Sequence, residues 1–124
     1  MATAHWPTEI RLKDGGRALS VAYDDATFEL AAEYLRVSSP SAEVQGHTAA
    51  EKRTVGGKRR VIVTGVEPVG HYAVKLVFDD GHDSGLFTWD YLYELGAEHD
   101  AKWAHYLGEL EAKGLSRDVP SFGR

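Results

Sequence analysis

The residues of this chain that are best equipped for chemistry lie together in the segment 79–83, which reads Asp-Asp-Gly-His-Asp. Three carboxylates, on Asp79, Asp80 and Asp83, and the imidazole of His82 are enough ligands for a divalent metal ion. The same residue types also favour a tight turn, because Asp side chains hydrogen-bond to nearby backbone and Gly adopts positive φ. A simple turn and a metal or small-ligand site therefore both remain open.

A second histidine, His47, stands in a polar stretch after the first predicted helix. If the two halves of the chain pack side by side, His47 and His82 come near each other and, with Glu43 or an Asp, form a two-histidine metal site. The alternative is a solvated loop histidine. His99 and His105 are not spaced by one helical turn on the last predicted helix, so they lie on different faces and do not form a shared metal site.

Aromatic side chains gather around the predicted helices, and Tyr34, Trp89 and Tyr91 are among them. Such residues either pack in a core or, where they are exposed, form a face that binds a partner. Together with Arg36, these three residues make up the predicted interaction site. The sequence does not choose between the core and the interface.

Motifs of known enzyme classes are missing from the sequence. It contains no G-x-S-x-G, no P-loop, no H-E-x-x-H and no strand-borne set of two His and a carboxylate for a non-haem iron. The chain has no cysteine, which excludes thiolate zinc sites, thiolate-bound iron–sulfur clusters and cysteine nucleophiles. We therefore expect no catalytic residue, and a divalent metal is the one cofactor that the sequence leaves open.

The composition indicates one small acidic domain. The chain has 124 residues and a formal charge of -5, which argues against a general nucleic-acid binder. Its basic cluster lacks the aromatic residues needed for base stacking, and is either a solvated hairpin tip or a phosphate site. The cluster consists of Lys52, Arg53, Lys58, Arg59 and Arg60. No leader segment and no apolar run of roughly 20 residues occurs, so we expect a cytoplasmic protein without a membrane partner.

Periodicity predicts the elements that position these groups. In the first half, residues 9–13 and 18–23 alternate around an Asp-Gly-Gly turn and predict a hairpin. Residues 31–36 are good helix formers, and Pro40 follows where the helix must end. Residues 43–58 are polar and indicate a long loop.

The second half of the chain repeats this plan. The predicted elements are strands at 60–66, 71–78 and 86–88, a helical turn at 89–95 and a helix at 98–113. Trp103, Tyr106, Leu107 and Leu110 form an apolar stripe on that last helix. We expect residues 115–124 to be a flexible tail.

The two halves also share a sequence phrase. Residues 19–25 match residues 75–80 in apolar alternation and in a closing acid pair, and the helix segment 33–35 then matches 90–92. The second copy has two extra residues between its acid pair and its helix, in the turn that contains His82. Chance similarity is the alternative. A true repeat predicts an α+β fold, in which two strand–turn–strand–helix units make a small twisted, mostly antiparallel sheet with the C-terminal helix packed on it.

Longer segments resemble a known family. Residues 6–10, 32–47, 67–76, 78–85 and 89–92 are similar to DUF971, the γ-butyrobetaine hydroxylase-like N-terminal domain. The resemblance extends from residue 6 to residue 117, nearly the whole chain. It implies that residues 1–124 form a single domain of this family.

The resemblance implies a zinc site that this chain does not keep. In the eukaryotic hydroxylases the domain precedes a 2-oxoglutarate- and iron-dependent oxygenase and holds a structural zinc with three Cys and one His. His82 falls where the zinc histidine would be, but Ser39, Ser41 and Val44 fall where the cysteines would be. We therefore do not expect the family's zinc in this chain.

The resemblance also suggests a role. Bacterial members of the family mostly stand alone, and the domain also resembles the terminal portion of some P-loop iron–sulfur carrier ATPases. An iron–sulfur carrier ATPase or an oxygenase is therefore the expected kind of protein partner. The first functional hypothesis is a non-catalytic accessory or protein-interaction module. The alternative is a metal-binding or small-ligand-binding protein that uses the Asp79–Asp83 turn and His47.

Overall fold

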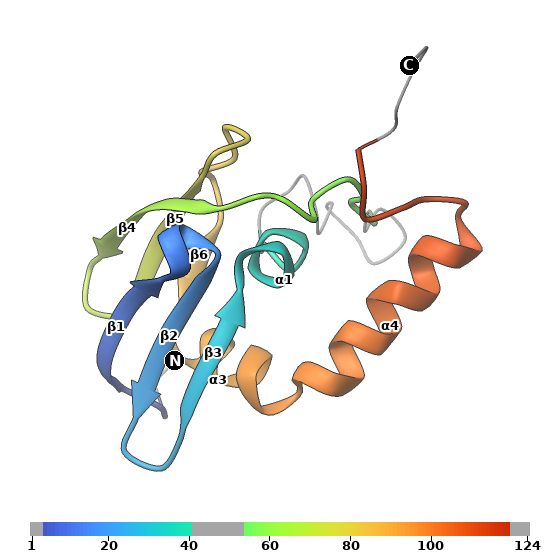
Figure 1. Ribbon diagram of the computed structural model, residues 1–124. Helices are drawn as coiled ribbons and strands as arrows, with labels where there is room; N and C mark the ends of the chain where they lie inside the picture. The colour runs from blue at the N-terminus through green and yellow to red at the C-terminus, as the bar shows by residue number, and fades with distance from the viewer. Residues whose placement is uncertain (1–3, 41–53, 120–124) are drawn as a thin grey trace.

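The computed structural model describes residues 4–40 and 54–119 of the chain. The first half forms three strands and a helix: β1 (Pro7–Lys13), β2 (Ala18–Tyr23), β3 (Thr27–Ala31) and α1 (Ala32–Val37). The strands make an antiparallel sheet in the order β1-β2-β3, and α1 follows β3 directly (Figure 1). This half is therefore a β-β-β-α unit.

The second half forms the same kind of unit. Its elements are β4 (Val63–Val69), β5 (Ala73–Phe78), β6 (Leu86–Thr88) and α3 (Trp89–Ala97), and the longer α4 (His99–Ala112) comes after them. The antiparallel order is β4-β5-β6. The predicted α+β class is confirmed, and each unit has a three-stranded sheet of its own. None of the helices in the described part of the chain is long and apolar enough to cross a membrane.

The two units agree in detail, which supports the predicted repeat. β2 and β5 have the same alternation of buried and partly buried residues, and each ends directly before an acid pair. A break in register lies at the start of β1, between Pro7 and Glu9, and a second lies at the start of β4, between Val63 and Gly65. In each unit the first N–H of the helix donates to the residue just before the middle strand, at 2.7 Å in one unit and 3.1 Å in the other.

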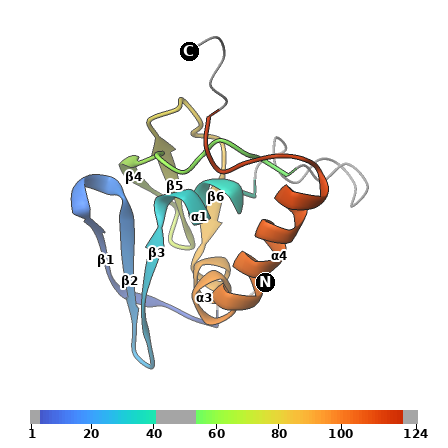
Figure 2. The ribbon, with the colours of Figure 1, turned by 45° about the vertical axis from the view of Figure 1, so that its right-hand side comes forward.

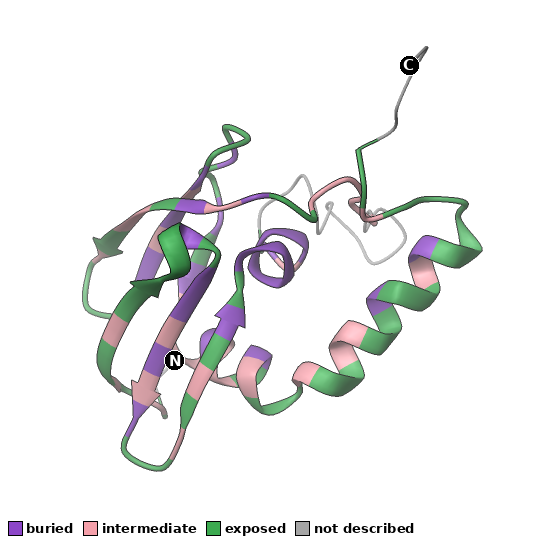
Figure 3. Ribbon diagram, viewed as in Figure 1, coloured by how far each residue is buried: buried purple, intermediate pink, exposed green. Residues whose placement is uncertain are grey.

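The core lies between the sheets and the two helices α1 and α3. All six residues of α1 are buried, and the inner faces of β2 and β5 are the other large buried surfaces (Figure 3). The largest fully buried side chains are Tyr34, Phe78, Phe87, Leu19, Leu30, Leu35, Leu76, Leu92, Leu95, Val21 and Val63. Burial of each aliphatic or aromatic side chain contributes roughly 1.5–3 kcal/mol, so this core holds the two units together.

The helix α4 lies outside the core, beyond α1 and α3 (Figure 2). Only Tyr106 and Leu110 of this helix are buried, and they pack with Val37 and Val55 in a second, smaller cluster that Trp103 joins. Nothing in the described part of the first unit corresponds to α4. It is the element that breaks the similarity between the two halves.

The chain that follows α4 returns across the molecule. Gly57 donates its backbone N–H to Ser116 at 2.8 Å, and Arg59 donates to Arg117 at 3.0 Å. The Arg117 guanidinium donates two hydrogen bonds to the buried Glu33 carboxylate, at 2.7 and 2.8 Å. Residues 115–119, the described part of the predicted tail, are therefore attached to α1 and to the segment before β4.

Two differences between predicted and observed strands have physical reasons. β4 continues through Pro68, past residue 66 where the strand was predicted to end. It can do so because β4 is an edge strand, and its proline deprives no second neighbouring strand of a hydrogen bond. β3 was not predicted, and it forms because residues 27–31 pair with Ala18–Ala22 of β2. Phe28 and Leu30 alternate with Thr27 and Glu29, but the run is only five residues long and leads directly into α1, so it does not mark a strand by itself.

Candidate functional site

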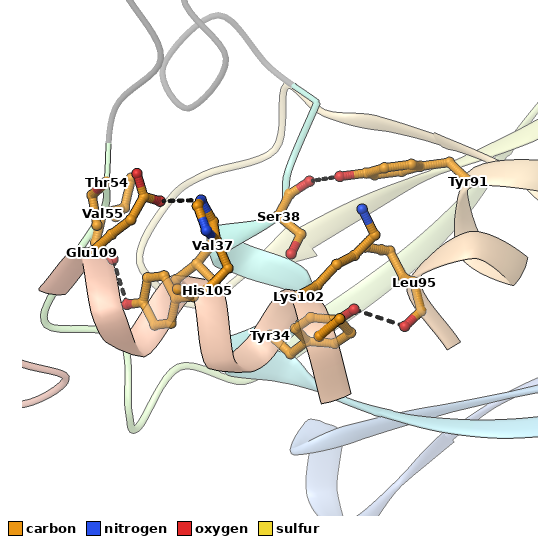
Figure 4. A pocket seen from close by; sticks show the side chains of 12 residues that line it. Tyr34, Val37, Ser38, Thr54, Val55, Tyr91, Leu95, Lys102, His105 and Glu109 are labelled. Atoms are coloured by element: carbon orange, nitrogen blue, oxygen red, sulfur yellow. Dashed lines mark hydrogen bonds and ion pairs between the residues drawn. The ribbon is translucent and has the colours of Figure 1, made fainter. Parts of the chain in front are cut away.

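A pocket of about 380 Å³ lies between α1, α3 and α4 (Figure 4). This volume is at the lower end of the range found for ligand pockets. Its lining combines aromatic, aliphatic and charged side chains. The lining residues are Tyr34, Val37, Ser38, Thr54, Val55, Tyr91, Leu95, Ala101, Lys102, His105, Tyr106 and Glu109.

Two reciprocal hydrogen bonds form the floor of the pocket. The Tyr34 hydroxyl, on α1, donates to the Leu95 carbonyl on α3 at 2.7 Å. The Tyr91 hydroxyl, on α3, donates to the Ser38 carbonyl after α1 at 2.5 Å (Figure 4). In the repeat, Tyr34 corresponds to Tyr91 and Ser38 corresponds to Leu95. The two bonds are therefore equivalent, and the pocket lies where the two units meet.

The helices α1 and α3 also make equivalent contacts with the other unit. Each one contacts the turn that follows the middle strand of that unit, β5 or β2. Arg36 of α1 donates to Asp80 in the second unit at 2.8 Å. Tyr93 of α3 donates to Asp25 in the first unit at 2.7 Å. The two donors occupy the same position in their helices, and each acid is the second of its acid pair. The two units therefore exchange equivalent helix contacts outside the pocket lining as well.

Two glycines let these helices approach the opposite unit. A methyl group at Gly96, on α3, would overlap the ring of Phe28 on β3. A methyl group at Gly85, before β6, would overlap the side chain of Ser39 after α1. These contacts are again equivalent, because Phe28 corresponds to Gly85 and Ser39 to Gly96. At each place one copy supplies a glycine and the other copy a side chain.

The pocket carries charge along its α4 side. Lys102 pairs with Glu94 of α3 at 2.9 Å and with Glu98 at 3.9 Å. His105 and Glu109, one turn apart on α4, approach to 3.5 Å. The polar groups thus lie at the rim, while the floor between the helices is aromatic and aliphatic.

The tyrosines of the pocket hold their protons strongly. Burial raises the pKa of Tyr34 well above its usual range, and the nearby Tyr91, Glu98 and Glu94 raise it further. Burial and then Glu94 raise the pKa of Tyr91 to about 12. Burial is thus the main reason that both phenols at the pocket floor stay protonated, and the Glu94 carboxylate of α3 adds to it.

The predicted Asp79–Asp83 site lies away from this pocket. The Asp79 carboxylate accepts a hydrogen bond from the Ile62 backbone at 3.1 Å, and Asp83 is exposed. Lys58 donates to Asp80 at 2.6 Å beside Arg36. Burial alone would raise the pKa of Asp80, but hydrogen bonds from Lys58, the His82 backbone and Arg36 lower it to about 2.

His82 is buried and faces α1. Its Nε2 lies 2.9 Å from the hydroxyl of Ser39, which is fully buried. Of the predicted zinc-site positions, these two therefore do meet. A serine hydroxyl does not replace a thiolate as a zinc ligand, so the described residues do not fit the family's zinc ion. Ser41, Val44 and His47 lie outside the described residues, and the two-histidine site stays a prediction.

No group of three or more His, Asp or Glu side chains within residues 4–40 and 54–119 could hold a metal ion. The predicted interaction residues also occupy different environments. Tyr34 and Arg36 are 2% and 3% exposed, so their contacts are inside the chain. Trp89 and Tyr91 are partly buried, and the Trp89 indole donates to the His71 carbonyl at 2.8 Å.

Sequence reasoning found Tyr34 and Tyr91 but missed the α4 side of the pocket. The sequence contained one indication that Lys102 forms an ion pair, because Lys102 lies four residues after Glu98 on the predicted helix. That spacing is common on solvated helices, so it did not distinguish a pocket residue. The approach of Glu94 from the preceding helix depends on the turn between α3 and α4, which periodicity does not describe.

Comparison with solved structures shows the same fold in close relatives. An NMR solution structure of a protein 51% identical has a TM-score of 0.80, with 97% of this chain and 96% of that chain covered. A second NMR structure is 40% identical with a TM-score of 0.79, and covers 100% and 96%. A search of curated proteins finds no match.

A crystal structure from Acidithiobacillus ferrooxidans ATCC 23270 is 45% identical, with a TM-score of 0.62 over 74% of this chain and 93% of that chain. That protein is described as one of unknown function in the DUF971 family. The family model "Gamma-butyrobetaine hydroxylase-like, N-terminal" matches residues 10–93, which extend from β1 into α3 and so span most of both β-β-β-α units. The chain belongs to the γ-butyrobetaine hydroxylase-like N-terminal (DUF971) family.

Proposed function

We propose that this protein is a non-catalytic accessory module that binds a partner protein in the pocket between α1, α3 and α4. The observation that carries the proposal is the pocket floor, where the Tyr34 and Tyr91 hydroxyls fix α1 and α3 to each other. A floor held in this way is pre-formed, and a pre-formed pocket binds without the cost of ordering its own side chains. Its aromatic lining suits the anchor residue of a partner.

The chemistry of the lining supports binding over catalysis. The hydroxyls of Tyr34, Tyr91 and Tyr106 each donate to a main-chain carbonyl. Burial raises the pKa of all three, so they keep their protons at neutral pH and are poor general bases. The remaining charged groups form pairs at the rim.

The kind of partner follows from the resemblance alone. Similar domains are joined to 2-oxoglutarate oxygenases or to iron–sulfur carrier ATPases, so we propose a cytoplasmic partner of one of these kinds. This choice rests on association between domains, and the pocket geometry does not enter it.

Site-specific photo-crosslinking in the organism that encodes the protein tests the proposal. Benzoylphenylalanine is placed at Ala101, which lines the pocket, and, as a matched control, at Ala104, which is exposed on the same helix outside the lining. We expect a discrete adduct with one protein from position 101 and none from position 104. Equal labelling from both positions, or no adduct from position 101, would contradict the proposal.

A further inference from the structure

Oxygen acceptors gather at one side of the pocket. Two main-chain carbonyls, those of Ser38 and Leu95, lie at its floor near the C-terminal ends of α1 and α3. The C-terminal end of a helix carries partial negative charge, which attracts cations. Two carboxylates, Glu94 and Glu98, stand beside the described lining at the α3–α4 side, where both pair with Lys102.

The two carboxylates act on tyrosines that line the pocket. After burial and the neighbouring Tyr91, Glu98 and Glu94 are the groups that raise the pKa of Tyr34, and Glu94 also raises that of Tyr91. A negative charge on either phenol is disfavoured there chiefly because the phenol is buried, and the carboxylates add to that effect. The carboxylates, unlike burial, favour a positive charge beside them.

The chain itself places a cation in this position. The Lys102 ammonium lies between Glu94 and Glu98, at 2.9 and 3.9 Å, while its side chain lines the pocket. That side chain is 32% exposed, so it can leave for solvent. A lysine is a flexible point charge that needs no fixed geometry, which makes such an exchange inexpensive.

The aromatic lining favours the same class of ligand. Tyr34, Tyr91 and Tyr106 line the pocket from three different helices. The face of a phenol ring attracts a cation, and its apolar surface suits the methylene chain that carries an ammonium group. Among the described lining residues His105 is the one other basic group, and it lies 3.5 Å from Glu109 with its side chain 71% exposed.

We infer that the pocket accepts a basic side chain of the partner protein, whose ammonium group takes the place of Lys102 beside Glu94 and Glu98. The inference rests on the proposed function and names the group that the partner presents. Lys102 is then the internal stand-in for that group when the partner is absent.

Three peptides that differ only in their central residue test the inference. The central residue, which lies between two leucines, is lysine in the first peptide, norleucine in the second and glutamate in the third. They are titrated into the ¹⁵N-labelled full chain, and amide shifts of the pocket residues are followed. We expect the lysine peptide to bind about tenfold tighter than the norleucine peptide, and the glutamate peptide to bind weakest. In Glu94→Gln the preference for lysine should shrink.

A second variant separates competition from a structural effect. In Lys102→Met the internal cation is removed, so the lysine peptide should bind several-fold tighter than to the wild type. Lys75→Met is the matched control, because Lys75 also pairs with a Glu and is 33% exposed but lies on β5. Its binding should equal that of the wild type.

The outcomes distinguish the inference from the proposed function. Equal binding of the lysine and norleucine peptides at the pocket overturns the inference and leaves the proposed function in place. Pocket shifts with n-butylamine as strong as with the lysine peptide assign the site to a small amine and overturn the partner-protein source. The absence of pocket shifts with any peptide contradicts the proposed function as well.

Discussion

At the scale of single residues, two tyrosine hydroxyls join the units. The last carbonyls of a helix have no partner within that helix, and the Tyr34 and Tyr91 hydroxyls satisfy the Leu95 and Ser38 carbonyls across the interface. Each bond thus replaces water at a helix end and ties one unit to the other.

We expect Tyr34→Phe and Tyr91→Phe each to lower the free energy of unfolding by about 1 kcal/mol. The two losses should be similar because the bonds are equivalent in the repeat. Urea denaturation measures both, with Tyr72→Phe as control, since Tyr72 is 47% exposed and its change should stay within about 0.5 kcal/mol. Variants of Tyr34 and Tyr91 as stable as that control would show that the bonds contribute nothing.

Asp80 is the residue whose protonation couples the fold to pH. Arg36 and Lys58 both donate to its carboxylate, at 2.8 and 2.6 Å. These bonds connect α1, the turn before β6 and the segment before β4. The pKa of Asp80 in the folded chain, about 2, therefore lies below its ordinary value of 3.8.

Stability should accordingly fall in acid. Because the unfolded chain takes up the proton at higher pH than the folded chain, the contribution of Asp80 is complete above about pH 4 and is lost as the pH falls toward 2. Denaturation measured between pH 5 and 2 should show this loss in the wild type and a shallower slope in Asp80→Asn. If the free energy of unfolding depended on pH in the same way in the wild type and in Asp80→Asn, Asp80 would not be the cause of the acid sensitivity.

The sequence indicated that Asp80 and His82 were unusual residues but did not reveal their contacts. The Asp80 partner Arg36 and the His82 partner Ser39 both lie in the other half of the chain, on α1 or just after it. A local cluster of acids and a histidine looks the same whether its groups face an ion or another part of the chain. Only the packing of α1 against the second unit distinguishes the two.

At the scale of elements, close approach of α3 to β3 depends on Gly96. The ring of Phe28 occupies the space that a side chain at position 96 would need. At Gly108, on α4, an added Cβ atom would have no other heavy atom within 4 Å. Replacing each glycine by alanine therefore separates two effects. At Gly96 the added methyl group meets a packed neighbour, and at Gly108 only the helix preference of the residue changes.

Gly96→Ala should destabilise the protein by about 1–3 kcal/mol, because the added methyl overpacks the helix–strand contact. Gly108→Ala should stabilise it by up to about 1 kcal/mol, because alanine is the better helix former. Thermal or urea unfolding of both variants checks the signs. The packing account fails if Gly96→Ala is as stable as the wild type.

Most elements were predictable because their periodicity is local. The sequence placed β2, β5, β6, α3 and α4 within a few residues, since apolar alternation or a helical stripe marks each one. The strand β3 and the extension of β4 through Pro68 were missed. Both depend on pairing with a neighbouring strand, which the residues of the strand itself do not encode.

At the scale of the whole molecule, two equivalent units meet through their helices, and α4 is added on one side. The repeat was visible in the sequence as matching acid pairs and matching helices, and the two extra residues of the second copy lie in the turn of His82. The pocket was not visible there, because it arises from the junction of the units with α4. Its lining comes from α1, the segment before β4, α3 and α4.

The affinity of the crosslinked partner for pocket variants tests the central claim most directly. The partner, once purified, is titrated calorimetrically into the wild type, Ala101→Trp and Ala104→Trp. We predict that a tryptophan at 101, which fills the pocket, weakens binding by about 100-fold or more, a loss of about 2.7 kcal/mol, while a tryptophan at 104 leaves it unchanged. Wild-type affinity in Ala101→Trp would contradict the pocket as the binding site.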